Sequence, residues 1–121
     1  MKNAVFGLVL ALAPTLAAAG DTSVVRAKAA KMGGSWRIDV TIRHDDAGWD
    51  HYADGWGVYT TDGTQLGYRE LLHPHVNEQP FTRSLSGVEI PDHVTVVTIR
   101  AHDLVHGHGG KVVSVDLNGN P

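Results

Sequence analysis

Cysteine is absent from this chain of 121 residues. Without cysteine we expect no disulfide framework, no thiolate metal site and no lipid attachment at a cleavage point. Met32 is the single methionine after the starting one, so a soft Cu(I) site built from thioethers is not expected. Blocks of basic residues are also absent, and the formal net charge of −3 argues against a nucleic-acid partner.

Long apolar runs are scarce, and the one that is present stands at the start of the chain. Residues 5–13 are mostly apolar, follow the positive charge of Lys2 and precede the small residues 17–19. A membrane-spanning helix needs about 20 apolar residues, whereas a short apolar core before small residues is typical of a cleaved signal peptide. We therefore predict a signal peptide over residues 1–19 and a single exported domain over residues 20–121. That domain is expected in the periplasm or secreted, with no membrane anchor after cleavage.

The rest of the chain shows the period-two alternation of β-strands. Apolar and polar residues alternate throughout residues 36–43, which indicates a strand with one buried and one solvent-exposed face. The other expected strands, separated by turn residues, cover residues 21–31, 55–61, 64–72, 81–88, 94–101 and 111–117. The first of these also fits a helix, because it is rich in alanine and lysine. The pattern predicts an all-β fold, a seven-stranded antiparallel sandwich of the immunoglobulin or fibronectin type III kind.

Histidine is abundant, with eight residues, and it is unevenly distributed. Seven of the eight fall in or beside three expected loops: His44 and His51, His73 and His75, and His102, His106 and His108. Successive strands of such a sandwich run in opposite directions, so alternate loops emerge at the same end. We therefore expect these three loops to meet at one end, with His93 in a turn at the other.

Several imidazoles at one end of a domain indicate a metal site. Imidazole is the commonest protein ligand for zinc and copper, and three or four nitrogen donors within one pocket make a site. We predict a Zn(II) or Cu(II) site formed by His73, His75, His102 and His106, with His108, His44 and His51 in reserve. The candidate carboxylate ligands, or acceptors for the ring N–H groups, are Asp50, Glu78 and Asp103.

Several of these loop residues also have a simpler structural interpretation. His44 continues the buried parity of the strand before it and could cap the core. Asp45 and Asp46 fit a solvated pair in a loop, and binding of a hard cation such as calcium is the open alternative. Glu78 and Arg83 fit an ion pair that fixes the loop between them.

A different class of function also fits a polar, histidine-rich end. The loops could form a non-enzymatic surface that binds another exported protein or a glycan, with Trp49 and Tyr52 as an aromatic wall or as a cap over the core. Clustered histidines could also charge together near pH 6 and give a pH-responsive element. An enzyme is not expected, because the chain has no cysteine and no G-x-S-x-G motif. A histidine–aspartate pair for acid–base chemistry stays possible in principle.

Two blocks of the sequence resemble those of a known group of proteins. HPHVNEQPFTRSLSGVEIP (73–91) and RAHDLVHGHGGK (100–111) are similar to signature blocks of an uncharacterised family of small exported bacterial β-sandwich proteins. The resemblance extends from residue 36 to residue 115 and implies an exported, one-domain β protein, with no activity or ligand residue to carry over. The expected mature N-terminus has no histidine, unlike β-sandwich copper oxygenases, which use that amine as a ligand.

Overall fold

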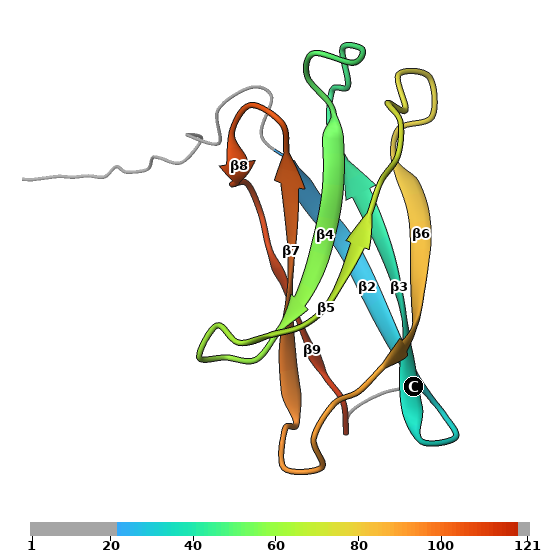
Figure 1. Cartoon of the computed structure of the whole chain (residues 1–121), viewed down its shortest axis with the longest axis vertical. Coiled ribbons are helices and arrows are strands. Elements are labelled where there is room, and N and C mark those ends of the chain that lie inside the picture. The colour runs from blue at the N-terminus through green and yellow to red at the C-terminus, as the bar shows by residue number, and fades with distance from the viewer. Residues whose placement is uncertain (1–21, 119–121) are drawn as a thin grey trace, which may run out of the picture.

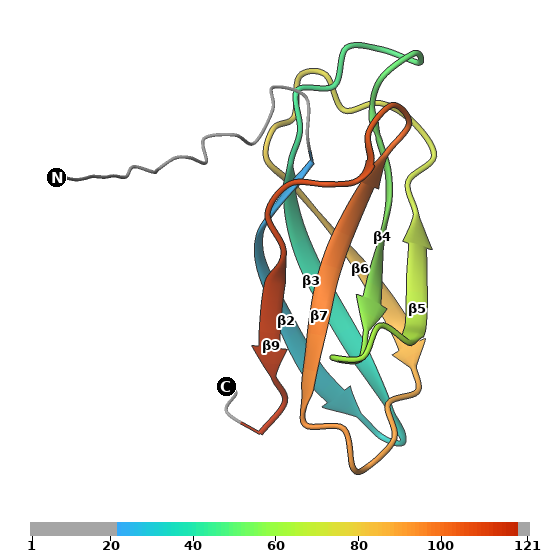
Figure 2. The same ribbon diagram turned by 90° about the vertical axis from the view of Figure 1, so that its left-hand side faces the viewer.

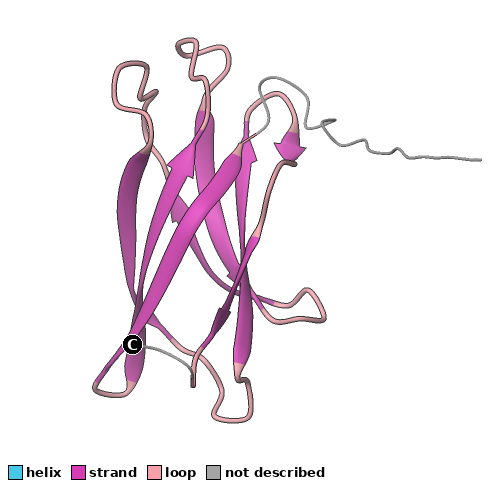
Figure 3. Cartoon of the chain, turned by 180° about the vertical axis from the view of Figure 1, so that it is seen from behind, coloured by secondary structure: helices cyan, strands magenta, loops and turns pink. Residues whose placement is uncertain are grey.

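A computed structural model describes residues 22–118 of the chain. The predicted signal peptide, residues 1–19, lies outside the described residues. The described chain consists of strands joined by loops and turns (Figure 3), so it contains no helix that could cross a membrane. The strands are β2 (Ser23–Met32), β3 (Ser35–Arg43), β4 (Ala53–Tyr59), β5 (Gln65–Glu70), β6 (Phe81–Val88), β7 (Val96–Asp103), β8 (Gly107–His108) and β9 (Val113–Asp116).

The strands form two antiparallel sheets that face each other (Figures 1 and 2). One sheet has the order β2-β3-β6, and the other has the order β5-β4-β7-β8, with β9 also paired to β7. The predicted all-β, sandwich-like architecture is thus confirmed. The part of the chain that the structure describes holds eight strands instead of seven, because the loop after β7 contains the two-residue strand β8.

The core lies between the two sheets and is built by the alternation visible in the sequence. In β3 the side chains of Ile38, Val40 and Ile42 are fully buried, and β4 adds the fully buried ring of Trp56. Burial of each such side chain stabilises the fold by about 1.5–3 kcal/mol. The apolar face predicted for residues 36–43 is therefore the face that packs.

β2 is a strand, so the helix that its alanine- and lysine-rich composition also fitted is excluded for this segment. It pairs with β3 along its length, and a bulge shifts the register between Val24 and Arg26. A bulge inserts one extra residue and so reverses the parity of the residues that follow. Val24 is therefore buried on the same side as Ala27 and Ala29, which pack against the core. The bulge explains why the alternation in this segment is loose.

Three loops meet at one end of the sandwich, as the strand directions require (Figures 1 and 2). They are the β3–β4 loop (44–52), the β5–β6 loop (71–80) and the β7–β8 hairpin with its flanking residues (102–108). We call this end the histidine pole, because it holds seven of the eight histidines. His93 lies in the turn between β6 and β7 at the opposite end. The predicted convergence of the three loops is confirmed.

Candidate metal centre

Two strands that build the core also carry polar side chains to its edge. Asp103 is the last residue of β7 and keeps the inward parity of Val97, Ile99 and Ala101. His44 follows the last residue of β3 and keeps the inward parity of that strand. Both side chains are fully buried. The two strand ends therefore bring a carboxylate and an imidazole together beneath the three loops.

Asp103 is held by the backbone of its own hairpin. Its Oδ1 accepts the backbone N–H groups of Val105 at 2.8 Å and His106 at 2.5 Å, and its Oδ2 accepts the hydroxyl of Thr22 at 3.3 Å. Burial raises the pKa of this carboxyl, but the N–H groups of His106 and Val105 outweigh burial and hold the pKa below its ordinary value. Asp103 is therefore a carboxylate at neutral pH.

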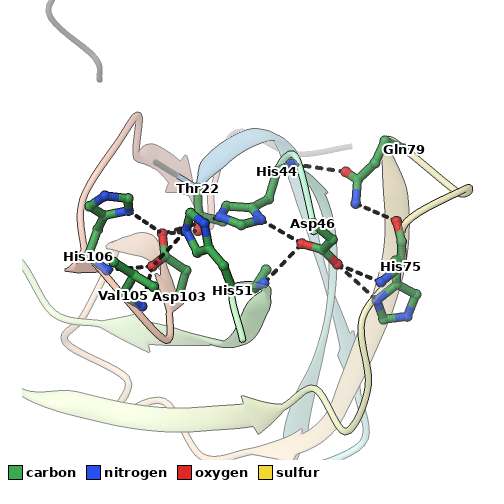
Figure 4. Close-up of polar contacts among 10 residues, drawn as sticks. Thr22, His44, Asp46, His51, His75, Gln79, Asp103, Val105 and His106 are labelled. Carbon is green, nitrogen blue, oxygen red and sulfur yellow. Dashed lines mark hydrogen bonds and ion pairs between the residues drawn. The ribbon is translucent and has the colours of Figure 1, made fainter. Parts of the chain in front are cut away.

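His44 lies between two carboxylates (Figure 4). Its Nδ1 is 2.5 Å from Asp46 Oδ1, and its Nε2 is 3.3 Å from Asp103 Oδ2. Asp46 accepts the Nδ1 proton, so a neutral ring turns the lone pair of Nε2 toward Asp103. Two electron-rich atoms at this separation repel each other unless a proton or a metal cation lies between them.

His51 completes a group of three possible ligands. Its Nε2 is 3.5 Å from Asp103 Oδ1, and its ring stands edge-on to that of His44 with the ring centroids 4.8 Å apart. One ligand atom from each of His44, His51 and Asp103 lies within 4.8 Å of the other two. We call these three residues the buried centre. His106 stands beside it, with Nδ1 3.3 Å from Asp103 Oδ2 and its ring 5.0 Å from that of His51.

The spacing of the buried centre suits a metal ion with nitrogen and oxygen ligands. Bonds of about 2.0–2.2 Å in a tetrahedral arrangement separate the ligand atoms by ~3.3–3.5 Å. His44 Nε2 is 3.3 Å from Oδ2 of Asp103 and His51 Nε2 is 3.5 Å from its Oδ1, so each nitrogen lies at this distance from one of the two oxygens. Both Nε2 atoms are buried without a hydrogen-bond partner among residues 22–118, and such a group costs about 1–3 kcal/mol if it stays unsatisfied. One metal ion would satisfy both nitrogens.

Asp46 and Gln79 tie the surrounding loops to the centre (Figure 4). Asp46 accepts the backbone N–H of Ala53 at 3.0 Å through Oδ1 and that of His75 at 2.5 Å through Oδ2. Gln79 accepts the backbone N–H of His44 at 2.9 Å and donates its side-chain N–H to the carbonyl of His75 at 2.9 Å. The β3–β4 and β5–β6 loops are thus cross-linked by hydrogen bonds, which fixes the orientation of the His44 ring.

Asp46 is the important residue that the sequence did not reveal. We predicted a solvated pair of Asp45 and Asp46, and this is wrong for Asp46, whose side chain is fully buried while Asp45 is exposed. The physical reason is that donors from two loops turn inward and share its two oxygens. The spacing of two residues from His44 is the signal that could have pointed to this role.

The histidine pair of the β5–β6 loop lies beside the buried centre. His75 is buried, stacks on Phe81 with ring centroids 4.0 Å apart, and accepts an N–H of Arg83 on Nε2 at 3.0 Å. Burial and the charge of Arg83 lower the pKa of His75, so the ring is neutral at pH 7. His73 is exposed, with its ring 4.6 Å from that of His75. The predicted ion pair of Arg83 and Glu78 is confirmed at 3.8 Å.

His102 and His108 occupy the other face of the β7–β8 hairpin. They are register partners across the two strands, and their ring centroids are 4.9 Å apart. Adjacent residues of a strand point to opposite faces, so His102 faces away from the buried Asp103. The Nδ1 of His102 lies 2.5 Å from Asp54 Oδ1, at the outer side of the sheet.

The structure therefore sorts the seven histidines of the pole into three groups. His44, His51 and His106 surround Asp103, His73 accompanies His75, and His102 accompanies His108. The four first-choice ligands, His73, His75, His102 and His106, are spread over all three groups. The group with metal-ligand spacing is formed by the reserve residues His44 and His51 with Asp103.

Apolar side chains from the same loops are exposed around the histidine pole. Trp49 is 66% exposed and packs edge-on against Tyr52, with ring centroids 5.6 Å apart. The other exposed apolar residues of these loops are Leu72, Val76, Leu104 and Val105. A buried polar centre thus lies beneath a partly apolar rim, and we call these exposed residues, with Trp49, the apolar rim.

Comparison with known proteins gives a similarity to part of a longer protein. No protein-family model matches the chain, and no solved structure matches it. A protein of Halomicrobium mukohataei named "Putative lipoprotein" is 51% identical over 79 residues, which make up 65% of this chain. The chain spans 38% of the length of that protein.

Proposed function

We propose that this protein is an exported metal-binding module that holds Zn(II) or Cu(II) in the buried centre. His44 and His51 supply imidazole nitrogen, Asp103 supplies carboxylate oxygen, and His106 is placed to supply a fourth ligand. The observation that carries the proposal is the pair of buried Nε2 atoms, which lack hydrogen-bond partners within the described residues and face a carboxylate at 3.3 and 3.5 Å. The role is binding, with no reaction assigned to the centre.

The donor set selects the class of metal. Two imidazoles and a carboxylate suit Zn(II) or Cu(II), whereas calcium takes roughly 6–8 oxygen ligands. Asp46 accepts the Nδ1 proton of His44 and leaves Nε2 for the metal, which is the usual carboxylate–histidine–metal arrangement. The His51 side chain is 23% exposed and that of His106 is 35% exposed, so these two rings form the solvent-exposed side of the centre.

The other predicted ligands take different roles in this proposal. His75 uses Nε2 as an acceptor for Arg83, whose positive charge would oppose a cation at that nitrogen. We therefore assign His75 to the support of the β5–β6 loop, together with the neighbouring His73. His102 points to the opposite face of the hairpin and belongs to a separate site.

Titration of the purified protein with Zn(II) and Cu(II) tests the proposal. His51→Ala is the informative variant, because its partly exposed ring can be removed with less damage than that of His44. Replacing a residue that hydrogen-bonds to a metal ligand usually lowers metal affinity about 10–100-fold. Because His51→Ala removes a ligand itself, we expect its metal affinity to fall by more than this. His93→Ala, at the opposite end, should bind as the unaltered protein does. Millimolar affinity, or a folded His51→Ala variant that binds the same number of ions with the same affinities as the unaltered protein, would refute the proposal.

Export and the type of sandwich are part of the same proposal. Export is supported by the signal-peptide pattern of residues 1–19 and by the name of the similar protein, "Putative lipoprotein". A fibronectin type III or immunoglobulin-like kind is supported by the sheet composition. The first, second and fifth strands form one sheet, and the fourth strand joins the sheet of the third and sixth.

The apolar rim favours a second candidate function, a surface that binds a protein or a glycan. The exposed Trp49 packed on Tyr52 resembles a platform on which an apolar group or a sugar ring could stack. Trp36 and Trp56 are less exposed, so fluorescence changes on adding a ligand would report mainly on Trp49. Saturable quenching by an oligosaccharide, abolished in Trp49→Ala and unaffected by chelators, would favour this function over metal binding.

A further inference from the structure

The β7–β8 hairpin carries a second pair of imidazoles outside the buried centre. His102 and His108 face each other across the two strands as register partners, with ring centroids 4.9 Å apart and planes inclined by 75°. Both rings stand on the outer face of the hairpin, whereas the adjacent Asp103 points inward. The pairing of β7 with β8, in which His102 is opposite His108 and Asp103 is opposite Gly107, holds the two rings at this separation.

In both rings the nitrogen that makes a hydrogen bond to the protein is Nδ1. The Nδ1 of His102 donates to Asp54 Oδ1 at 2.5 Å, and the Nδ1 of His108 donates to the carbonyl of Ala101 at 3.1 Å. With Nδ1 protonated, each neutral ring keeps the lone pair of Nε2 available. In a metal-ligating histidine, the ring nitrogen that does not bind the metal usually donates its N–H to a carboxylate or a carbonyl. The pair therefore shows the hydrogen bonding of metal ligands.

Gly107 and Tyr59 lie next to the two rings of this pair. Gly107 has no side chain, and a Cβ atom placed there would lie 3.9 Å from His102 Nε2. The ring of Tyr59 stands edge-on to His108 at 6.0 Å, and burial raises the pKa of its hydroxyl, which stays protonated. The guanidinium of Arg100 lies over the Tyr59 ring, at 5.1 Å from its centroid. Asp54, which accepts the Nδ1–H of His102, brings a negative charge to the pair.

We propose that His102 and His108 form a second, surface-exposed site for a divalent transition-metal ion, with Cu(II) bound most tightly. Imidazole nitrogens bind Cu(II), Ni(II) and Zn(II), and Cu(II) has the highest affinity of the divalent series at a given nitrogen site. Two protein ligands leave the remaining positions to water, so the site binds and releases the ion readily. This site lies at the surface, on the outer face of the hairpin, and has two protein ligands, whereas the buried centre lies inside and has at least three.

Cu(II) titration followed by paramagnetic broadening of the histidine ring resonances tests this site. We expect the resonances of His102 and His108 to broaden together. His102→Ala and His108→Ala should each lower the affinity of the surface site at least 10-fold. Asp54→Asn should weaken it by about 10–100-fold without removing a ligand. His93→Ala serves as the control, because that residue is an isolated exposed histidine at the other end.

The buried centre and the surface site fail in different ways in this experiment. In His51→Ala the broadening of His102 and His108 should persist, even if no metal enters the buried centre. Affinity in the single variants equal to that of the unaltered protein would show adventitious binding to separate histidines and overturn the proposal. Broadening of His93 at the same Cu(II) concentration as His102 would overturn it as well.

Discussion

Asp46 supports the buried centre without belonging to it. Its oxygens receive the ring N–H of His44 and the backbone N–H groups of Ala53 and His75. A carboxylate in this position fixes the orientation of a ligating ring and raises its basicity. Metal affinity should therefore depend on a side chain that does not touch the ion.

We expect Asp46→Asn to lower the affinity of the buried centre for Zn(II) about 10–100-fold. The same change should destabilise the fold by ~1–3 kcal/mol, because an amide offers one acceptor oxygen where donors now occupy two. Zn(II) titration and urea denaturation measure the two effects. Asp45→Asn, the exposed neighbour, is the matched control and should change neither; similar losses in both variants would contradict this role.

His75 makes the stability of the fold depend on pH. Its pKa in the folded protein lies below the ordinary value of 6.5, because burial and Arg83 disfavour the charged ring. As pH falls through 6.5, the unfolded chain takes up this proton before the folded chain does, so folding stability decreases. The contribution of His75 is present above the unfolded pKa and is lost as the solution becomes acidic.

Replacement of His75 should therefore flatten the pH dependence of unfolding. Between pH 7 and 5.5, the free energy of unfolding of His75→Gln should fall less steeply than that of the unaltered protein. The difference in slope can reach at most about 1.4 kcal/mol per pH unit, the value for one proton. Chemical denaturation at several pH values measures it, with His93→Gln as the control. Parallel profiles would show that His75 is not responsible.

At the residue scale, the alternation of the strands was enough to predict which side chains point into the core. The inward position of His44 followed from the alternation of β3, and the same alternation in β7 extends to Asp103. The environments of Asp46 and His75 could not be predicted, because their partners come from other loops. Such contacts depend on how loops fold over one another, and no local periodicity records that.

The strands β4 and β5 show how one element is shaped by its neighbour. Gly55 in β4 lies under the ring of Tyr68 in β5, and a Cβ atom at this glycine would overlap the phenol group. Burial, together with the charge of Asp54, raises the pKa of Tyr68 to about 12. The absent side chain thus lets a protonated tyrosine cover the outer surface of the sheet.

Gly55→Ala should destabilise the protein by about 1–3 kcal/mol through this overlap. The penalty should largely disappear when Tyr68→Ala removes the ring, so the two changes should be strongly non-additive. Thermal or urea denaturation of the single and double variants measures the coupling. Gly34→Ala is the control, because a Cβ atom there meets nothing within 4 Å. Additive effects of the two changes would argue against a direct contact.

At the element scale, long strands were predictable and short irregularities were not. The seven expected strand segments correspond to β2 to β7 and β9, with ends displaced by a few residues. β8 has two residues in a glycine-rich loop and gives no periodic signal. The bulge in β2 broke the alternation there, which is why the segment also fitted a helix.

At the scale of the whole molecule, metal binding should appear as a gain in stability. Free Zn(II) at 100 times its dissociation constant should add about 2.7 kcal/mol, which corresponds to a rise in melting temperature of roughly 10 °C or more for a domain of this size. Calorimetry before and after addition of a chelator measures the rise. His51→Ala should lose it and His93→Ala should keep it; a melting temperature indifferent to metal would count against a folded-state site.

The hydrogen bond from Thr22 to Asp103 bears on which end of the domain should carry an affinity tag. Thr22 precedes β2 and contacts Asp103 of the buried centre. A polyhistidine tag fused directly before Thr22 would therefore lie close to the imidazoles of that centre and could compete with them for metal. β9 ends with Asp116 at the far end of the sandwich (Figure 2). An affinity tag or immobilisation linker placed after β9 would leave the histidine pole exposed to solvent. Tags for purification and immobilisation should therefore follow β9.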